Sequence, residues 1–431
     1  MSPHATPMHA DNDVAEDHVA QGFRSVRDNS LTLAAPLSPE DWMLQSMEDA
    51  SPLKWHLAHT TWFFETFLLC PHLPGYKTFH DDFTFLFNSY YQQVGSMHTR
   101  ARRGLLSRPS SDMVLAYRAH IDAAMDDLIE AAYGDEKIAD LICLGCAHEE
   151  QHQELMQTDI LHGFYQNAMR PAAYSDNQIE NGQPTQMADP IKWIGFEGGL
   201  VEKGAEGGFC FDNEMPRHKF FLNPFELSHR PVSNRDYLAF IEDGGYQDSR
   251  FWLADGWATV QTHGWTAPLY WERNESGAWE QFTLFGQVPL ALDAPVRHVS
   301  HFEAAAYANW AGAVLPTETE WEVAAARQAV HGHFLEAGKP ASRQASGDGE
   351  DGALHALFGS VWEWTQSPYA SYPGYKPAAG AIGEYNGKFM SSQMVLRGGS
   401  SATPLGHMRA TYRNFFPPSA RWQFSGFRLA R

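Results

Sequence analysis

The spacing of apolar residues changes once along this chain, and that change constrains the fold more than any other feature of the sequence. Residues 19–170 carry apolar side chains mostly at helical intervals. Residues 171–190 are polar and include three prolines, which is the composition of a linker. From residue 191 onward, short aromatic and β-branched runs alternate with Gly, Pro, Asn and Asp, as in strands joined by turns. The sequence therefore predicts a helical bundle followed by a domain of a different class. Long helices are expected over residues 51–70, 111–133 and 137–164.

The length supports this division, because 431 residues exceed what one ordinary core organises. We expect a flexible tail over residues 1–18, a helical domain over 19–170, a linker over 171–190 and a second domain over 191–431. Two helices are expected inside the second domain, over 300–310 and 317–329. Each begins with a Ser or Thr followed three residues later by Glu, which is the spacing of a capping box. The second domain is therefore expected to be α+β.

Charge and composition exclude several classes of function. The formal net charge is -21, which argues against nucleic acid or an anionic membrane surface as a partner. No apolar run reaches the length of a membrane span, and the polar start does not resemble a signal peptide. We expect a cytoplasmic enzyme with reduced thiols, because four cysteines in so long a chain do not make a disulfide framework. Composition makes no prediction of the oligomeric state.

Two histidines in the segment AHEEQHQE, residues 147–154, have the spacing of metal ligands. His148 and His152 are four residues apart, so on a helix both imidazoles project from one face. A third ligand is expected from the apolar run over residues 55–62, which offers His56 and His59. Three neutral imidazoles suit a divalent transition metal with open coordination positions. Glu154 is about 240° around the helix from His148, so it is expected to orient a ligand rather than to be one.

Several longer motifs point to one family. The first half contains SPLKWHLAH at 51–59 and FNSYY at 87–91, in addition to the histidine segment. The second half contains PVSN at 231–234, LPTETEWE at 315–322, GSVWEWT at 359–365, LRGGS at 396–400 and GFR at 426–428. Together these motifs resemble the ergothioneine sulfoxide synthases, which are non-haem iron enzymes. The resemblance implies a DinB-like four-helix bundle followed by a domain similar to formylglycine-generating enzyme, which has a C-type-lectin-like fold.

The resemblance also implies an iron site and a reaction. It makes His59, His148 and His152 the ligands of Fe(II), with His56 as the competing candidate for the first position. His59 is preferred because it follows the Leu-Ala pair, as the first ligand does in the family. The implied reaction joins the sulfur of a thiol to carbon 2 of the imidazole of hercynine, N-alpha-trimethylhistidine, while O2 oxidises the sulfur to a sulfoxide.

Other residues take roles from the same resemblance. Tyr90 and Tyr91 are the candidate proton donors for the oxygen chemistry. Arg100 and Arg103 are expected to bind the carboxylate of the thiol substrate, since guanidinium groups bind carboxylates bidentately. Gln151 is expected to contact the imidazole of hercynine.

The segment YRNFFPP, residues 412–418, aligns with a loop that closes over the substrates in this family. Asn414 is the expected contact to hercynine, and Phe415 and Phe416 are expected to wall the site, because aromatic faces attract a trimethylammonium group. Relatives that use γ-glutamylcysteine carry an acidic residue near the position of Phe416. The sequence therefore favours free L-cysteine as the sulfur donor.

The sequence is also compatible with other functions. The same fold supports γ-glutamylcysteine as the donor, or the joining of selenium in place of sulfur. A DinB-type metal-dependent thiol transferase would need neither O2 nor the second domain. A non-catalytic binding protein would keep its function without His148 and His152.

Overall fold

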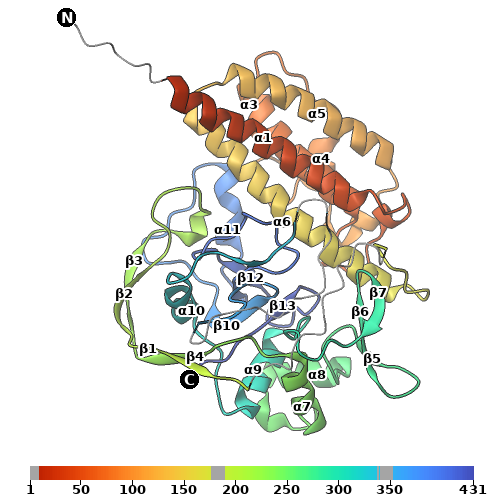
Figure 1. Cartoon of the computed structure of the whole chain (residues 1–431). Coiled ribbons are helices and arrows are strands. Elements are labelled where there is room, and N and C mark those ends of the chain that lie inside the picture. The colour runs from red at the N-terminus through yellow and green to blue at the C-terminus, as the bar shows by residue number, and fades with distance from the viewer. Residues whose placement is uncertain (1–8, 176–189, 337–338, 340–352) are drawn as a thin grey trace, which may run out of the picture. The chain divides into compact units, whose positions relative to one another are not determined.

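The chain divides into two compact units in the computed structural model, Met1–Asp159 and Ile160–Arg431. The structure describes residues 9–175, 190–336, 339 and 353–431 (Figure 1). The predicted linker falls largely outside these residues. The last described residues before that gap are ordered against the second unit, since the backbone N–H of Ala173 donates to the carbonyl of Leu284 at 2.8 Å.

The first unit consists of helices and their connections (Figure 1). Its elements are α1 (His9–Ala34), η1 (Asp41–Met43), α2 (Leu53–Phe64), η2 (Glu65–Leu69), α3 (Cys70–His72), α4 (Phe83–Phe87), η3 (Arg100–Leu105), α5 (Ser111–Ala131) and α6 (Glu136–Gln166), the last of which continues into the second unit. The helix expected over residues 51–70 is thus interrupted near its end by η2, a turn of π-helix. Helix α1 begins within the segment for which a tail is expected.

One buried carboxylate joins four helices of this unit. Glu149 of α6 accepts hydrogen bonds from Arg27 of α1 and Arg118 of α5, each at 2.7 Å, and from the hydroxyl of Ser30 at 2.6 Å. Arg27 also donates to Thr61 of α2 at 3.0 Å. Burial raises the pKa of Glu149, but the two guanidinium groups outweigh it and bring the pKa to about 2. The bundle core therefore contains a buried cluster of ion pairs, whose Glu149 directly follows His148 in the sequence.

The second unit combines short strands, short helices and long connections (Figure 1). Its strands are β1 (Trp193–Phe196), β2 (Gly199–Lys203), β3 (His218–Leu222), β4 (Phe225–Ser228), β5 (Trp271–Arg273), β6 (Trp279–Thr283), β7 (Gly286–Pro289), β8 (Gly332–His333), β9 (Phe358–Gly359), β10 (Trp362–Pro368), β11 (Met394–Arg397), β12 (Asn414–Phe416) and β13 (Ser425–Gly426). Its helices are α7 (Asn234–Glu242), α8 (Ala254–His263), α9 (His301–Trp310), α10 (Glu318–Ala325) and α11 (Glu384–Lys388), with 3-10 turns η5 (Asp212–Glu214), η6 (Ser249–Phe251) and η7 (Ala381–Gly383).

The central sheet of this unit has the strand order β12-β11-β10-β13. Strand β13 pairs with β10 in parallel, whereas the other two pairings are antiparallel. Trp321 and Trp364 are fully buried in the core. The two predicted capping boxes are confirmed: Ser300 caps α9 and Thr317 caps α10, each with the Glu three residues later. Helix α10 ends at Ala325, four residues before its predicted end.

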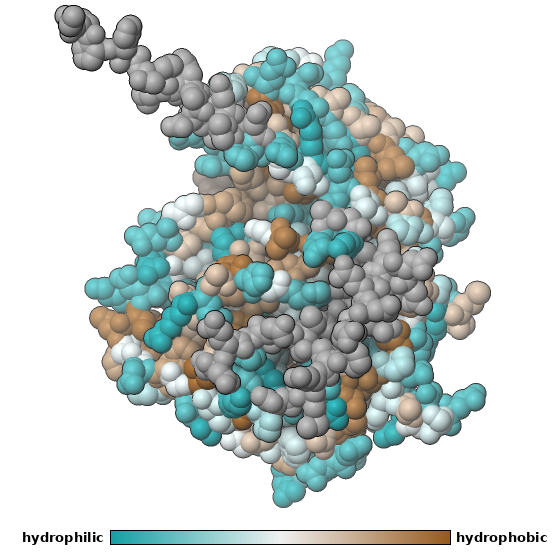
Figure 2. All heavy atoms as spheres, viewed as in Figure 1, coloured by the Kyte–Doolittle hydropathy of each residue, from teal (hydrophilic) through white to brown (hydrophobic). Residues whose placement is uncertain are grey.

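Hydrophilic side chains cover much of the face shown in Figure 2, with smaller groups of apolar residues between them. Such mixed surfaces are normal, because apolar atoms contribute about half or more of the exposed area of folded proteins. Among the described residues, no helix is long and apolar enough to cross a membrane.

Candidate metal centre

Helices α2 and α6 carry the four histidines of the predicted site. Every residue of α2 is buried, so His56 and His59 are enclosed by aromatic and aliphatic side chains. On α6, His148 and His152 are also buried, and their four-residue spacing brings both rings to the same face.

The structure brings His59, His148 and His152 together. One ring nitrogen of each lies within 4.8 Å of the other two, which allows all three to bind a single ion. The ring centroids of His148 and His152 are 4.7 Å apart, and those of His59 and His148 are 5.0 Å apart. His56 is outside this group.

Burial keeps these imidazoles neutral. It lowers the pKa of His148 to about 4; the nearby Glu149 partly offsets this effect of burial, and His56 adds a smaller lowering. The pKa values of His59 and His152 are also well below the usual range, first because of burial and then because of the neighbouring histidines and Arg103. A neutral imidazole is the form that ligates a metal.

The tautomer of His59 follows from its hydrogen bond. Its Nδ1 lies 2.6 Å from the carbonyl oxygen of Phe87, and a carbonyl only accepts, so Nδ1 carries the hydrogen. The lone pair of His59 is therefore on Nε2. In His148, Nδ1 is buried and has no hydrogen-bond partner among the described residues, so protein groups leave that nitrogen unsatisfied.

Aromatic rings fix the plane of His59. Its imidazole stacks between the indoles of Trp55, at 4.5 Å, and Trp62, at 5.6 Å, with interplanar angles of 13° and 14°. The guanidinium of Arg103 covers the other side of Trp55, with its Cζ 3.3 Å from the ring centroid. Arg103, Trp55, His59 and Trp62 thus form a continuous stack, which holds the ligand ring in one orientation.

His56 contacts the ligand group from outside. Its Nδ1 lies 2.7 Å from Nδ1 of His152, and its Nε2 lies 3.0 Å from a carboxylate oxygen of Asp159. The same oxygen accepts the backbone N–H of Ser51 at 2.8 Å. His56 therefore supports a ligand ring, and its own two nitrogens are both occupied.

The two predicted proton donors differ in their surroundings. Tyr91 is buried, and its ring packs against Trp62 with the ring centroids 5.7 Å apart. Trp62 in turn stacks on His59. Tyr90 is half-buried, has a φ of 71°, and its hydroxyl oxygen accepts a hydrogen bond from Arg100 at 2.9 Å. A positive φ is strained for a residue with a bulky side chain, so local contacts hold Tyr90 in this conformation.

The predicted carboxylate-binding arginines lie on the same turn, η3. Arg103 is buried and donates to the hydroxyls of Ser51 and Ser89, both at 2.9 Å. The Nε atoms of Arg100 and Arg103 are buried without a hydrogen-bond partner among the described residues. Gln151 is half-buried on α6, next to His152.

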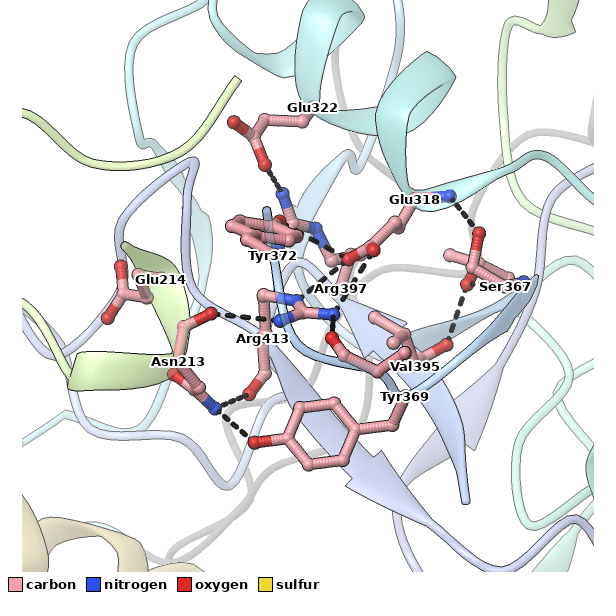
Figure 3. A network of polar contacts seen from close by, with 12 residues as sticks. Asn213, Glu214, Glu318, Glu322, Ser367, Tyr369, Tyr372, Val395, Arg397 and Arg413 are labelled. Atoms are coloured by element: carbon pink, nitrogen blue, oxygen red, sulfur yellow. Dashed lines mark hydrogen bonds and ion pairs between the residues drawn. The ribbon is translucent and has the colours of Figure 1, made fainter. Parts of the chain in front are cut away.

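Asn414, Phe415 and Phe416 form strand β12 of the second unit. Phe415 stacks on Tyr369 with ring centroids 4.0 Å apart, and Oδ1 of Asn414 accepts the backbone N–H of Phe415 at 2.8 Å. The residue before this strand, Arg413, is anchored in the buried network of Figure 3. It donates to Glu318 at 2.9 Å and to the carbonyl of Asn213 at 2.9 Å, which fixes the start of β12.

Sequence reasoning did not identify three residues of this centre. Trp55 and Trp62 lie in the run that contains the histidines, but no role is predicted for them. Asp159 is not among the predicted site residues. A signal for Asp159 exists, because it follows His152 by seven residues, which is about two helical turns and the same face of α6. The tryptophans also bracket His59 at helical spacing, four residues before it and three after it.

Comparisons with known proteins identify the families of both domains. The family model described as DinB superfamily matches residues 23–156, and the one described as sulfatase-modifying factor enzyme 1-like domain matches residues 180–351 and 350–431. These matches confirm the predicted fold class. A formylglycine-generating enzyme of Thermomonospora curvata is 29% identical over 44% of this chain and 75% of its own length.

Hercynine oxygenases match nearly the whole chain. The hercynine oxygenase of Mycolicibacterium thermoresistibile is 32% identical over 97% of this chain and 96% of its own. The hercynine oxygenase of Mycolicibacterium smegmatis is 33% identical over 88% of this chain and 91% of its own. With both domains matched in order and this identity over almost the full length, the chain belongs to the hercynine oxygenase family.

Proposed function

We propose that this protein is an Fe(II)- and O2-dependent sulfoxide synthase that joins L-cysteine to hercynine. The observation that carries the proposal is the group of three buried, neutral imidazoles whose ligand nitrogens lie within 4.8 Å of one another. The reaction balances with O2 as the oxidant. One oxygen atom enters the sulfoxide and the other leaves as water, while the thiol and carbon 2 of the imidazole each lose a hydrogen.

The donor set fits iron. His59, His148 and His152 supply three nitrogen ligands and no carboxylate, and imidazole suits iron among other divalent metals. When bound, the iron supplies the redox chemistry for O2 reduction and keeps coordination positions open for substrates. The protein contributes a dry, rigid enclosure, because the stack of Trp55, His59 and Trp62 holds one ligand ring in place.

Arg100 and Arg103 would hold the carboxylate of cysteine. Each has a buried Nε without a hydrogen-bond partner among the described residues, and a carboxylate would satisfy such donors. Arg103 is already fixed by Ser51, Ser89 and the face of Trp55, so it would bind without losing further side-chain freedom.

Tyr90 and Tyr91 would supply protons to the oxygen chemistry. The hydroxyl oxygen of Tyr90 accepts a hydrogen bond from Arg100, one of the two arginines proposed to bind the substrate carboxylate. The ring of Tyr91 packs against Trp62, and Trp62 stacks on His59, so one aromatic side chain separates Tyr91 from this histidine. Gln151, next to His152 on α6, would contact the imidazole of hercynine.

Strand β12 would contribute to hercynine recognition. Oδ1 of Asn414 is used by the backbone N–H of Phe415, so its amide nitrogen is the group that donates to a ligand. Phe415 and Phe416 offer aromatic faces for the trimethylammonium group, an attraction of about 0.5–2 kcal/mol. The phenyl ring of Phe416 carries no charge to recognise the amino group of a γ-glutamyl moiety, which favours free cysteine.

The test is product formation under controlled O2. The protein is loaded with Fe(II) without oxygen and then exposed to O2 with hercynine and, in turn, cysteine, γ-glutamylcysteine or a selenium donor. Mass spectrometry should show the cysteine-derived sulfoxide, and His148→Ala should abolish it. Product formed without O2 would favour a thiol transferase instead, and product from γ-glutamylcysteine alone would overturn the choice of donor.

A further inference from the structure

A chain of two hydrogen bonds connects a carboxylate to one of the three clustered histidines. Asp159 contacts Nε2 of His56 at 3.0 Å, and Nδ1 of His56 contacts Nδ1 of His152 at 2.7 Å. All three side chains are more than nine-tenths buried. His152 and Asp159 lie on α6 and His56 lies on α2, so these hydrogen bonds also connect the two helices that carry the histidine cluster.

When both imidazoles are neutral, the donors and acceptors of these two hydrogen bonds have a single consistent direction. An ionised carboxylate only accepts, so the hydrogen between Asp159 and His56 is on Nε2 of His56. The same oxygen of Asp159 also accepts the backbone N–H of Ser51, which agrees with its role as acceptor. A neutral His56 then has its lone pair on Nδ1, and it accepts the Nδ1 hydrogen of His152. The lone pair of His152 is therefore on Nε2.

We propose that Asp159 and His56 are positioning residues that fix the tautomer of His152 and strengthen it as a metal ligand. This role rests on the proposed metal centre, and it adds two supporting residues to the three ligands. The two hydrogen bonds prevent rotation of the His152 ring, and the negative charge of Asp159 is relayed through His56 to make Nε2 a better donor.

The three ligand candidates are thereby supported in different ways. His59 donates to a neutral carbonyl, that of Phe87, and Nδ1 of His148 has no hydrogen-bond partner among the described residues. Among the described residues, hydrogen bonds through His56 connect His152 to the carboxylate of Asp159. We therefore expect His152 to depend most on its supporting residues.

The first experiment measures metal binding rather than turnover. Co(II) is titrated anaerobically into the full-length protein, and its visible absorption reports affinity and ligand geometry. His56→Phe and Asp159→Asn should each lower the affinity by about 10–100-fold and shift the spectrum. His56→Gln should retain most of the affinity, because an amide can accept from His152 and donate to Asp159. A purely structural role would make His56→Gln and His56→Phe equivalent.

Matched controls come from an exposed pair in the same unit. His80 and Asp82 lie 3.9 Å apart at the surface, so His80→Phe and Asp82→Asn make the same chemical changes away from the cluster. Both should bind Co(II) like the wild type. Circular dichroism and the melting temperature of each variant separate lost affinity from lost folding.

The second experiment needs no variant of the chain. In Zn(II)-loaded protein labelled with 15N-histidine, NMR distinguishes the two neutral tautomers. His152 should carry its hydrogen on Nδ1, and His56 should carry its hydrogen on Nε2 alone. A hydrogen on Nδ1 of His56 would overturn the inference.

The outcomes separate this inference from the proposed function. If His148→Ala loses Co(II) while His56→Phe and Asp159→Asn bind within threefold of the wild type, the positioning role is wrong and the metal centre stands. If the wild type binds Co(II) no better than His148→Ala, the metal centre itself is wrong, and the positioning role falls with it.

Discussion

The stack of Arg103, Trp55, His59 and Trp62 places a cation, two indoles and a neutral imidazole in one column. The burial that makes this column rigid also makes His59 hard to protonate. Metal binding needs the lone pair of a neutral ring, so packing and ligand chemistry favour the same state of this residue. The protein thus fixes the conformation of this candidate ligand by packing alone.

Replacement of either tyrosine by phenylalanine tests the proposed proton donors. Tyr90→Phe and Tyr91→Phe keep the ring and remove the hydroxyl. Without this proton donor, O2 would still oxidise the thiol. We expect sulfoxide formation to fall by about 10²–10⁴-fold in the variant that lacks the true donor, because positioned acids contribute about that much. Products are quantified by mass spectrometry, and cysteine sulfinic acid should increase. Unchanged sulfoxide yield in both variants would contradict the assignment.

At this scale the sequence predicted which histidines would cluster but not what orients them. His148 and His152 were recognisable because the spacing of a helix is regular and local. The choice of His59 over His56 came from family resemblance, and the structure groups His59 with the other two. The contact between His56 and Asp159 spans 103 positions in the chain, and no local rule specifies such a pairing.

The contact of four helices at Glu149 depends on charge. Glu149→Ala would leave Arg27 and Arg118 buried without their shared partner, and breaking a buried ion pair costs about 3–5 kcal/mol. We expect that loss in the free energy of unfolding of the first unit, measured by urea denaturation. Asp126→Asn is the control, because its pair with Arg24 is exposed and should contribute less than about 1 kcal/mol. Equal losses in the two variants would show that the Glu149 cluster is not a structural centre.

The network at the start of β12 predicts a pH dependence (Figure 3). Burial raises the pKa of Glu318, but Arg413, Lys203 and Arg397 lower it more, so its folded-state pKa is below the usual 4.5. A carboxyl group with a depressed folded pKa binds protons more weakly in the folded state, so its stabilisation is present above pH 4.5 and is lost as the pH falls below it.

Glu318→Gln should therefore be less stable than the wild type at pH 7, and the difference should shrink as the pH falls below about 4.5. Urea denaturation of both proteins across this range measures the effect. Gln keeps the size of the side chain, so a difference that stays constant with pH would point to packing rather than charge. Ser276→Ala, at an exposed turn, serves as the control and should show no pH-dependent difference.

The helices of the first unit were more predictable than the strands of the second. The expected helix over 111–133 corresponds to α5, and that over 137–164 to α6, since each is long and periodic. The π-helical turn η2 was not predicted, because one extra residue per turn leaves little trace in an apolar pattern. Strand β13 pairs with β10 across more than 60 residues, and short runs carry no information about such partners.

Across the whole molecule, the order of the two domains could be read from the change of pattern near residues 171–190. The structural division falls earlier, between Asp159 and Ile160, which is inside α6. A boundary set by compactness need not coincide with one set by composition. The roles expected for Asn414, Phe415 and Phe416 in the second unit rest on family resemblance, because no local pattern in the sequence specifies them.

The division into two units predicts that metal stabilises one of them. The proposed ligands all lie in Met1–Asp159, so an ion bound there adds to the stability of that unit by mass action. Co(II) at about 100 times its dissociation constant should contribute about 2.7 kcal/mol. Scanning calorimetry should show a metal-dependent rise in the unfolding temperature of the transition that Glu149→Ala weakens. The transition that Glu318→Gln weakens should not move, and His148→Ala should abolish the rise. A metal-dependent rise that survives in His148→Ala would locate the binding site elsewhere in the chain.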